Sequence, residues 1–250
     1  MYSYIAYPFD VAKTNRILGT SFNRECGDNL GRELVAMYER GQFRNGAYRG
    51  MLPLVGTTLI GNVLGTHSFD MTGVKLLAFT TLSQPLNILM TQRQVINSTT
   101  FAEPSYGQIM KNWGANLPKL VTLGYTSALA RNALLMTAFL PKTMGNESML
   151  VDMGFALGAI LASHPFEVAR VLIVCQEQNR MIGSTLSTLQ GVYAAEGVAG
   201  LFKGLTPRTI HTFPVLFSLV AASYGGQNQA AFEGLRTNPL LGSLKLSTAD

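Results

Sequence analysis

The sequence predicts an all-α membrane protein built from three helical hairpins. Its charge is low for its length, with 14 acidic and 19 basic residues among 250, while 47% of the residues are hydrophobic. The runs 50–69 and 209–232 contain no Asp, Glu, Lys or Arg, and each is long enough for the roughly 20 apolar residues that a membrane span requires. A pattern that occurs three times along the chain then predicts six membrane-spanning helices.

The repeated pattern consists of a proline and, farther along, a glycine. The prolines are Pro8, Pro85 and Pro165, and the glycines are Gly50, Gly124 and Gly204. The glycine follows its proline by 42, 39 and 39 residues. The first and third prolines also begin the pattern P-x-[DE]-x-x-[KR]. Self-similarity at a nearly fixed spacing indicates an internal repeat.

The pattern divides the chain into three repeats and a tail. The predicted limits are 1–70, 71–146 and 147–228 for the repeats and 229–250 for the C-terminal tail. Each repeat should contain a helix with the proline, a loop of about thirty residues and an apolar helix after the glycine. Short amphipathic segments in the loops predict loop helices near 29–38, 106–113 and 184–195.

The basic residues are distributed unevenly between the two predicted sides of the membrane. Thirteen of them fall between the two helices of a hairpin, and four fall on the opposite side: Lys75, Lys142, Arg236 and Lys245. An excess of Lys and Arg in short loops marks one face of a membrane protein. We therefore expect the three hairpin loops to lie on the same side of the membrane.

The third repeat carries the most complete motif. It has Pro165, Glu167 and Arg170, then the pair at 196–197 and the triplet Phe202-Lys203-Gly204. This motif and its threefold repetition resemble the mitochondrial carrier family, over essentially the whole chain. The resemblance implies a six-transmembrane-helix, pseudo-threefold carrier bundle in the mitochondrial inner membrane, with the hairpin loops on the matrix side. Seven residues precede Pro8, so we expect a truncated first helix in a degenerate family member.

The resemblance also predicts a matrix gate, in which the acidic residue of one proline motif pairs with the basic residue of the next repeat. The corresponding residues are Asp10, Lys13, Asn87, Met90, Glu167 and Arg170. Glu167 is expected to pair with Lys13, while Asp10 would face Met90. Asn87 would offer Arg170 a neutral hydrogen bond. A buried ion pair that forms and breaks can gate a path; the alternative is helix-end charges that packing makes tolerable.

Two further sets of positions follow from the resemblance. The opposite gate is reduced to an outer-gate remnant, Phe69 and Asp70. The substrate-contact candidates, seven residues after each hairpin glycine, are Thr57, Arg131 with the adjacent Asn132, and His211. Arg followed by an amide resembles the pattern for small carboxylates or keto acids, which a guanidinium binds through two parallel hydrogen bonds. The alternatives are Arg131 held by backbone carbonyls, a lipid or a neighbouring subunit, and His211 as a neutral core histidine.

These observations leave two hypotheses for the function. No nucleophile with a base, no metal cluster and no phosphate-binding loop stands out, so no enzyme, cofactor or metal is predicted, and the uncharged spans exclude a nucleic-acid binder. The incomplete gates and short first helix favour a transport-impaired accessory subunit of a larger, respiratory-type inner-membrane complex. Its partners would be neighbouring subunits and membrane lipid such as cardiolipin. The alternative is an active carrier of small anionic solutes anchored by Arg131.

Overall fold

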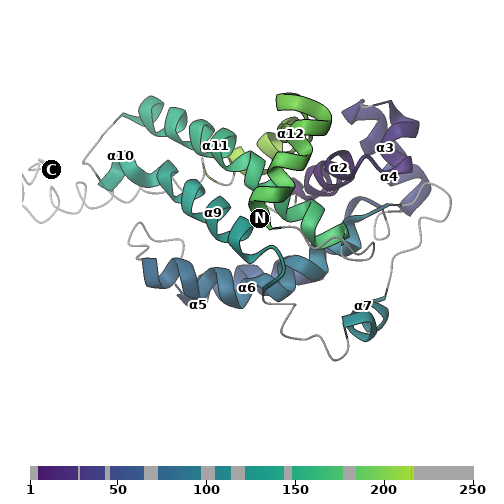
Figure 1. Cartoon of the computed structure of the whole chain (residues 1–250), viewed down its shortest axis with the longest axis horizontal. Helices are drawn as coiled ribbons and strands as arrows, with labels where there is room; N and C mark the ends of the chain where they lie inside the picture. Colours follow the sequence, from purple (N-terminus) through teal and green to yellow (C-terminus); the bar gives the residue numbers. More distant parts are fainter. Residues whose placement is uncertain are drawn as a thin grey trace, which may run out of the picture.

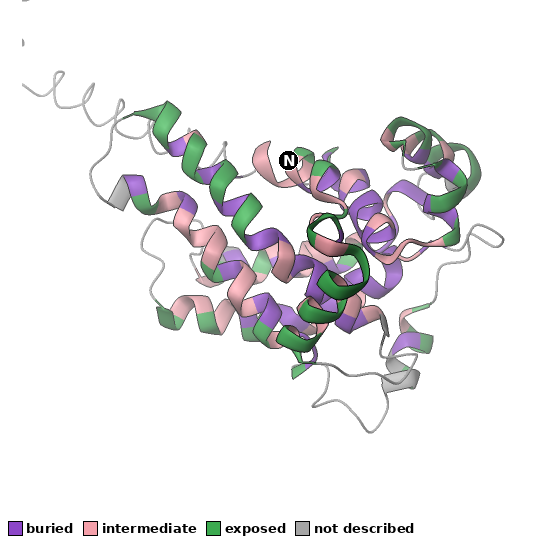
Figure 2. Cartoon of the chain, turned by 45° about the horizontal axis from the view of Figure 1, so that its top comes forward, coloured by how far each residue is buried: buried purple, intermediate pink, exposed green. Residues whose placement is uncertain are grey.

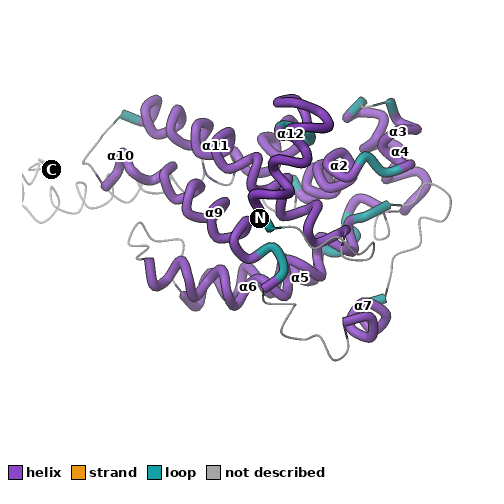
Figure 3. The backbone as a smooth tube through the Cα atoms, in the orientation of Figure 1, coloured by secondary structure: helices purple, strands orange, loops and turns teal. Residues whose placement is uncertain are grey.

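The computed structural model describes residues 5–27, 29–42, 46–64, 73–96, 105–113, 122–143, 148–176, 184–214 and 216. In these ranges every regular element is a helix and no strand occurs (Figures 1 and 3). The expectation of an all-α protein is therefore confirmed for the described part of the chain.

The three motif prolines all lie in helices. Helix α2 (Tyr7–Leu18) has its proline in the first turn, where the missing amide hydrogen costs no helical hydrogen bond. Helices α6 (Gly73–Gln94) and α11 (Met149–Gln176) contain Pro85 and Pro165 in their interiors. An interior proline removes one backbone hydrogen bond and favours a bend.

The second helix of each predicted hairpin follows its glycine. These helices are α5 (Met51–Leu64), α9 (Tyr125–Met136) and the helical residues 205–214. After α9 the chain continues through the 3-10 helix η3 (Thr137–Phe139) into α10 (Leu140–Thr143). Helix α5 packs along α6, and α9 packs against both α6 and α11 (Figure 1). The long helix α11 therefore lies at the centre of the described helices.

The loops between these helices contain further helices: α3 (Ser21–Cys26), α4 (Leu30–Gln42), α7 (Tyr106–Trp113) and α12 (Thr185–Leu201). The loop helices predicted near 29–38, 106–113 and 184–195 correspond to α4, α7 and α12. Helix α12 extends beyond the predicted segment because it continues through a kink at Gly197, whose φ is 66°.

The three hairpin glycines share one backbone conformation. They are Gly50, Gly124 and Gly204, with φ of 74°, 63° and 75°, a region that glycine adopts without the penalty a Cβ brings. A Cβ at Gly50 would lie 3.0 Å from the Met90 carbonyl oxygen, and one at Gly204 would lie 3.0 Å from that of Lys13. A Cβ at Gly124 would lie 3.6 Å from Cγ of Arg170. Each glycine thus packs against the fifth residue after the proline of the next predicted repeat, and the third repeat packs against the first. The limits of the repeats stay a prediction.

Among the described helices, one is long and apolar enough to cross a membrane, at Met149–Cys175 within α11. A shorter apolar helix, Met51–Gly61, covers part of the predicted span at 50–69. Most of the run 209–232 lies outside the described residues. Along α11, exposed and buried residues alternate with the helical turns, and exposed apolar side chains include Leu150 and Phe155 (Figure 2). The bundle of six spans remains a prediction.

Candidate functional site

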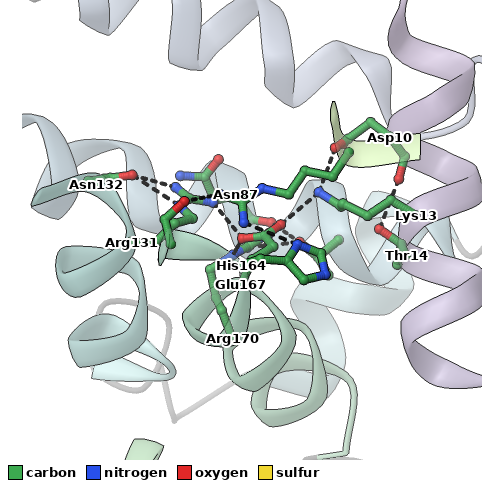
Figure 4. A network of polar contacts seen from close by, with 12 residues as sticks. Asp10, Lys13, Thr14, Asn87, Arg131, Asn132, His164, Glu167 and Arg170 are labelled. Atoms are coloured by element: carbon green, nitrogen blue, oxygen red, sulfur yellow. Dashed lines mark hydrogen bonds and ion pairs between the residues drawn. The ribbon is translucent and has the colours of Figure 1, made fainter. Parts of the chain in front are cut away.

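A cluster of buried charged side chains lies where α2, α9 and α11 meet (Figure 4). Its centre is Glu167, two residues after the proline of α11, with a side chain only 2% exposed. Oε1 of Glu167 accepts hydrogen bonds from Nζ of Lys13 at 2.7 Å and Nη2 of Arg170 at 2.9 Å. Oε2 accepts from Nη1 of Arg131 and Nε of Arg170, both at 2.9 Å. One carboxylate therefore binds three cations from three helices.

The contact between Lys13 and Glu167 joins residues 154 positions apart in the sequence. It links the first proline motif to the third, and it is the ion pair that the resemblance to the carrier family implied. The two side chains are almost completely buried, so solvent has little access to the ion pair. Its role as a gate stays a prediction.

Asp10, the second carboxylate of the cluster, does not simply face Met90 as expected. Oδ1 of Asp10 accepts from Nζ of Lys13 at 2.6 Å, and Oδ2 accepts from Nε2 of Gln94 at 2.6 Å. Gln94 lies four residues after Met90, and residues at this spacing share one face of a helix. The Gln94 amide oxygen also accepts from the Thr14 hydroxyl at 2.7 Å. A neutral amide therefore takes the place of the missing basic residue.

Arg170 also finds a different partner on α6 from the one expected. Its Nη1 donates to the Thr91 hydroxyl at 3.0 Å. Nδ2 of Asn87 instead donates to the Ser83 hydroxyl of its own helix at 3.3 Å. Thr91 lies one helical turn beyond Asn87 and points to the same side. Arg170 thus keeps a neutral hydrogen bond to α6, but through a hydroxyl group.

The structure shows what holds Arg131. Besides donating to Glu167, its guanidinium donates through Nε and Nη2 to Oδ1 of Asn132, at 3.0 and 2.7 Å. Asn132 in turn donates to the Thr80 hydroxyl at 3.0 Å, which fixes the amide against α6. In this structure the side chains of Glu167 and Asn132 therefore hold Arg131.

The remaining predicted positions differ in their surroundings. The Thr57 hydroxyl donates to the Leu54 carbonyl of its own helix at 2.8 Å, so its hydrogen bond is made away from the charged cluster. Nδ1 of His211 lies 3.8 Å from Oδ1 of Asp10. The outer-gate remnant, Phe69 and Asp70, lies outside the described residues.

Sequence comparison finds one family match. The model of the family described as Mitochondrial carrier protein matches residues 151–224. The matched segment contains Glu167, Arg170 and His211. The match shows that residues 151–224 are similar to the mitochondrial carrier family. No curated protein matches the chain. Proteins of the carrier family are membrane transporters of the mitochondrial inner membrane, so a carrier-type membrane protein is the function class that the match supports.

The charges of the charged cluster do not cancel. Lys13, Arg131 and Arg170 contribute three positive charges, while Asp10 and Glu167 contribute two negative ones. Arg208, 3% exposed, adds a fourth cation; within the described ranges it donates to the Ser163 hydroxyl at 2.6 Å and has no carboxylate partner. Excess buried positive charge is costly unless an anion neutralises it. The site is therefore complementary to an anion.

A second buried histidine lies beside the cluster and differs from His211. Nε2 of His164 lies 2.9 Å from the Lys203 carbonyl oxygen, and its Nδ1 lies 3.2 Å from Nη1 of Arg208. Both ring nitrogens of His164 are thus occupied, as expected for a structural core histidine. Through these contacts His164 connects α11 to Lys203 and to the helix at 205–214.

Outside the membrane-spanning helices, the loop helices contain a buried thiol and a buried ion pair. Burial raises the pKa of the Cys26 thiol above the usual 9.0, and the carboxylates of Glu33 and Glu25 act in the same direction. Glu33 accepts from Nε of Arg16 at 2.8 Å, which connects α4 to the end of α2. This pair therefore fixes a loop helix to the helix that carries Asp10 and Lys13.

Proposed function

We propose that this protein is an active carrier that exchanges small carboxylates, keto acids among them, across the mitochondrial inner membrane. The observation that carries the proposal is Arg131, whose side chain is 15% exposed, in a cluster with more cations than carboxylates. Its partner Glu167 is itself a carboxylate. Arg131 thus already binds, within the protein, the chemical group that a solute would present.

The proposed mechanism is competition between carboxylates. A solute carboxylate would accept two parallel hydrogen bonds from Arg131 and displace Glu167 from it. Glu167 would then keep Lys13 and Arg170 as partners. Opening toward the matrix would further require the Lys13–Glu167 pair to break, and this step gives the pair its proposed role as the matrix gate. The six-helix pseudo-threefold bundle, with its loops in the matrix, is the frame that this mechanism assumes.

Uptake of labelled pyruvate into liposomes preloaded with pyruvate tests the proposal. A hydrogen bond to a charged group contributes about 1.5 to 3 kcal/mol, so Arg131→Gln should lower uptake roughly 10- to 150-fold. Arg40→Gln is the matched control because Arg40 pairs with Glu25 at an exposed position, with side chains 48% and 43% exposed, and uptake by this variant should be unchanged. Absence of uptake by the folded wild-type protein would overturn the proposal.

An accessory subunit of a respiratory-type complex is the second candidate, and one observation favours it. Among the residues at the predicted matrix gate, all of them described, a single ion pair joins two repeats, Lys13–Glu167. Co-purification from mitochondrial membranes at fixed stoichiometry with such a complex, together with no solute uptake, would support this candidate. Uptake that depends on Arg131 would exclude it.

A membrane lipid is the proposed partner in either case. A cavity of about 570 Å³ lies between the end of α2 and the start of the helix at 205–214. Its lining includes three basic residues, Arg16, Arg24 and Lys203. Basic side chains at a membrane surface bind phosphate headgroups, so the cavity suits an anionic lipid such as cardiolipin.

A further inference from the structure

His211 has one ring nitrogen near a carboxylate and one without a partner. Nδ1 lies 3.8 Å from Oδ1 of Asp10, a distance at which the contact is electrostatic. Nε2 is out of solvent and has no hydrogen-bond partner among the described residues. A carboxylate beside Nδ1 favours the tautomer with hydrogen on that nitrogen. The lone pair of Nε2 is then free to accept a proton.

The charges around His211 come from three elements and oppose one another. Asp10 and Lys13 act from α2, Glu167 acts from α11, and Arg208 acts from the helix of His211 itself. The two carboxylates favour a proton on the imidazole and the two cations oppose it. An additional negative charge at the site shifts this balance toward protonation.

We propose that binding of the solute anion is coupled to uptake of one proton on Nε2 of His211. This inference rests on the proposed function, since the anion is the solute that Arg131 would bind. The proton comes from the aqueous phase to which the site is open, bonds to the Nε2 lone pair and forms an imidazolium. It leaves when the anion leaves. By linkage, the anion strengthens proton binding by the factor by which the proton strengthens anion binding. The carrier would then move a proton with its solute.

Titration calorimetry of the purified full-length protein with pyruvate tests the coupling. Repeating the titration at about pH 7 in buffers of different ionisation enthalpy gives the number of protons taken up per anion. The wild type should take up close to one proton. His211→Gln, which keeps a hydrogen-bonding amide but cannot titrate, should bind pyruvate more weakly than the wild type and take up almost no proton. His164→Gln, the matched control at the other buried histidine, should retain the uptake.

Transport supplies an independent measurement. In proteoliposomes preloaded with pyruvate, lowering the external pH by one unit should raise the initial rate of labelled pyruvate uptake up to about tenfold in the wild type, relative to protein-free liposomes, and not in His211→Gln.

Each failure has its own meaning. Pyruvate binding without proton uptake in the wild type would overturn the coupling and leave the proposed carrier in place. Unchanged proton uptake in His211→Gln would also overturn it, because another group would be the acceptor. No pyruvate binding or uptake at all would overturn the proposed function, and the coupling with it.

Discussion

Replacing Glu167 with glutamine tests the centre of the charged cluster. The substitution keeps the size of the side chain but removes the charge that Lys13, Arg131 and Arg170 share. Lys13 keeps Asp10 as a partner at 2.6 Å, whereas Arg131 and Arg170 lose their only carboxylate within the described part of the chain. Breaking a buried ion pair by removing one partner costs about 3 to 5 kcal/mol.

Thermal unfolding of the purified protein in detergent measures this loss. For a chain of this size 1 kcal/mol corresponds to about 2 to 4 °C, so Glu167→Gln should lower the melting temperature by roughly 6 to 20 °C. The matched control is Glu196→Gln, because Glu196 pairs with Lys203 where the side chains are 42% and 43% exposed. Such a pair contributes at most about 1 kcal/mol.

Two results would refute this reasoning. One is a melting temperature for Glu167→Gln that lies within the range of Glu196→Gln. The other comes from the double variant with Arg131→Gln, which should lose about 0.5 to 3 kcal/mol less than the sum of the single variants, since residues in contact are not additive. Strict additivity would mean that Arg131 and Glu167 do not stabilise each other.

Two further predictions concern the backbone and the loop thiol. Gly204→Ala should lower the melting temperature by about 2 to 8 °C, because a left-handed residue with a Cβ costs about 1 to 2 kcal/mol and that Cβ would lie 3.0 Å from a carbonyl oxygen. Gly158→Ala, a helical position with open space around the Cβ, should not destabilise, and equal melting of the two variants would contradict the assignment. In a Cys175→Ser background, Cys26 should react with iodoacetamide more slowly at neutral pH than a free thiol. Its raised pKa leaves less thiolate there, so the rate should increase only through a pH above the usual 9.0, and a midpoint below that value would count against the burial.

The features of the fold that the sequence predicts best are those with a local cause. A glycine is required where φ is positive, and the three hairpin glycines, spaced regularly after their prolines, all adopt that conformation. The loop helices were visible through their amphipathic pattern, and α7 has the predicted limits. The length of each membrane helix was less predictable. An uncharged run shows which residues tolerate lipid, but packing against other helices decides where a helix ends.

At the site, charged partners were easier to predict than neutral ones. Lys13 and Glu167 are complementary charges at equivalent positions, and the structure joins them. Gln94 and Thr91 were missed because an amide or a hydroxyl has many uses in a helix and shows no charge pattern. The one available signal was their spacing, since each lies four residues after an expected gate position, Met90 or Asn87.

The second repeat explains why the cluster is arranged in this way. With Asn87 and Met90 neutral, one acidic and one basic residue of the predicted gate lose their partners in that repeat. Asp10 pairs instead with Lys13, and Arg170 pairs with Glu167, in both cases three residues away on the same helix. Asn87 and Met90 stand where the gate pattern has one acidic and one basic residue. Together the two replacements leave the net charge of the gate unchanged, so the folded state tolerates both. Among the six predicted gate residues, Lys13–Glu167 is then the single ion pair between repeats, so in the proposed mechanism less electrostatic energy would oppose its opening. A solute carboxylate that displaces Glu167 from Arg131 would act on Glu167, the acidic residue of this pair.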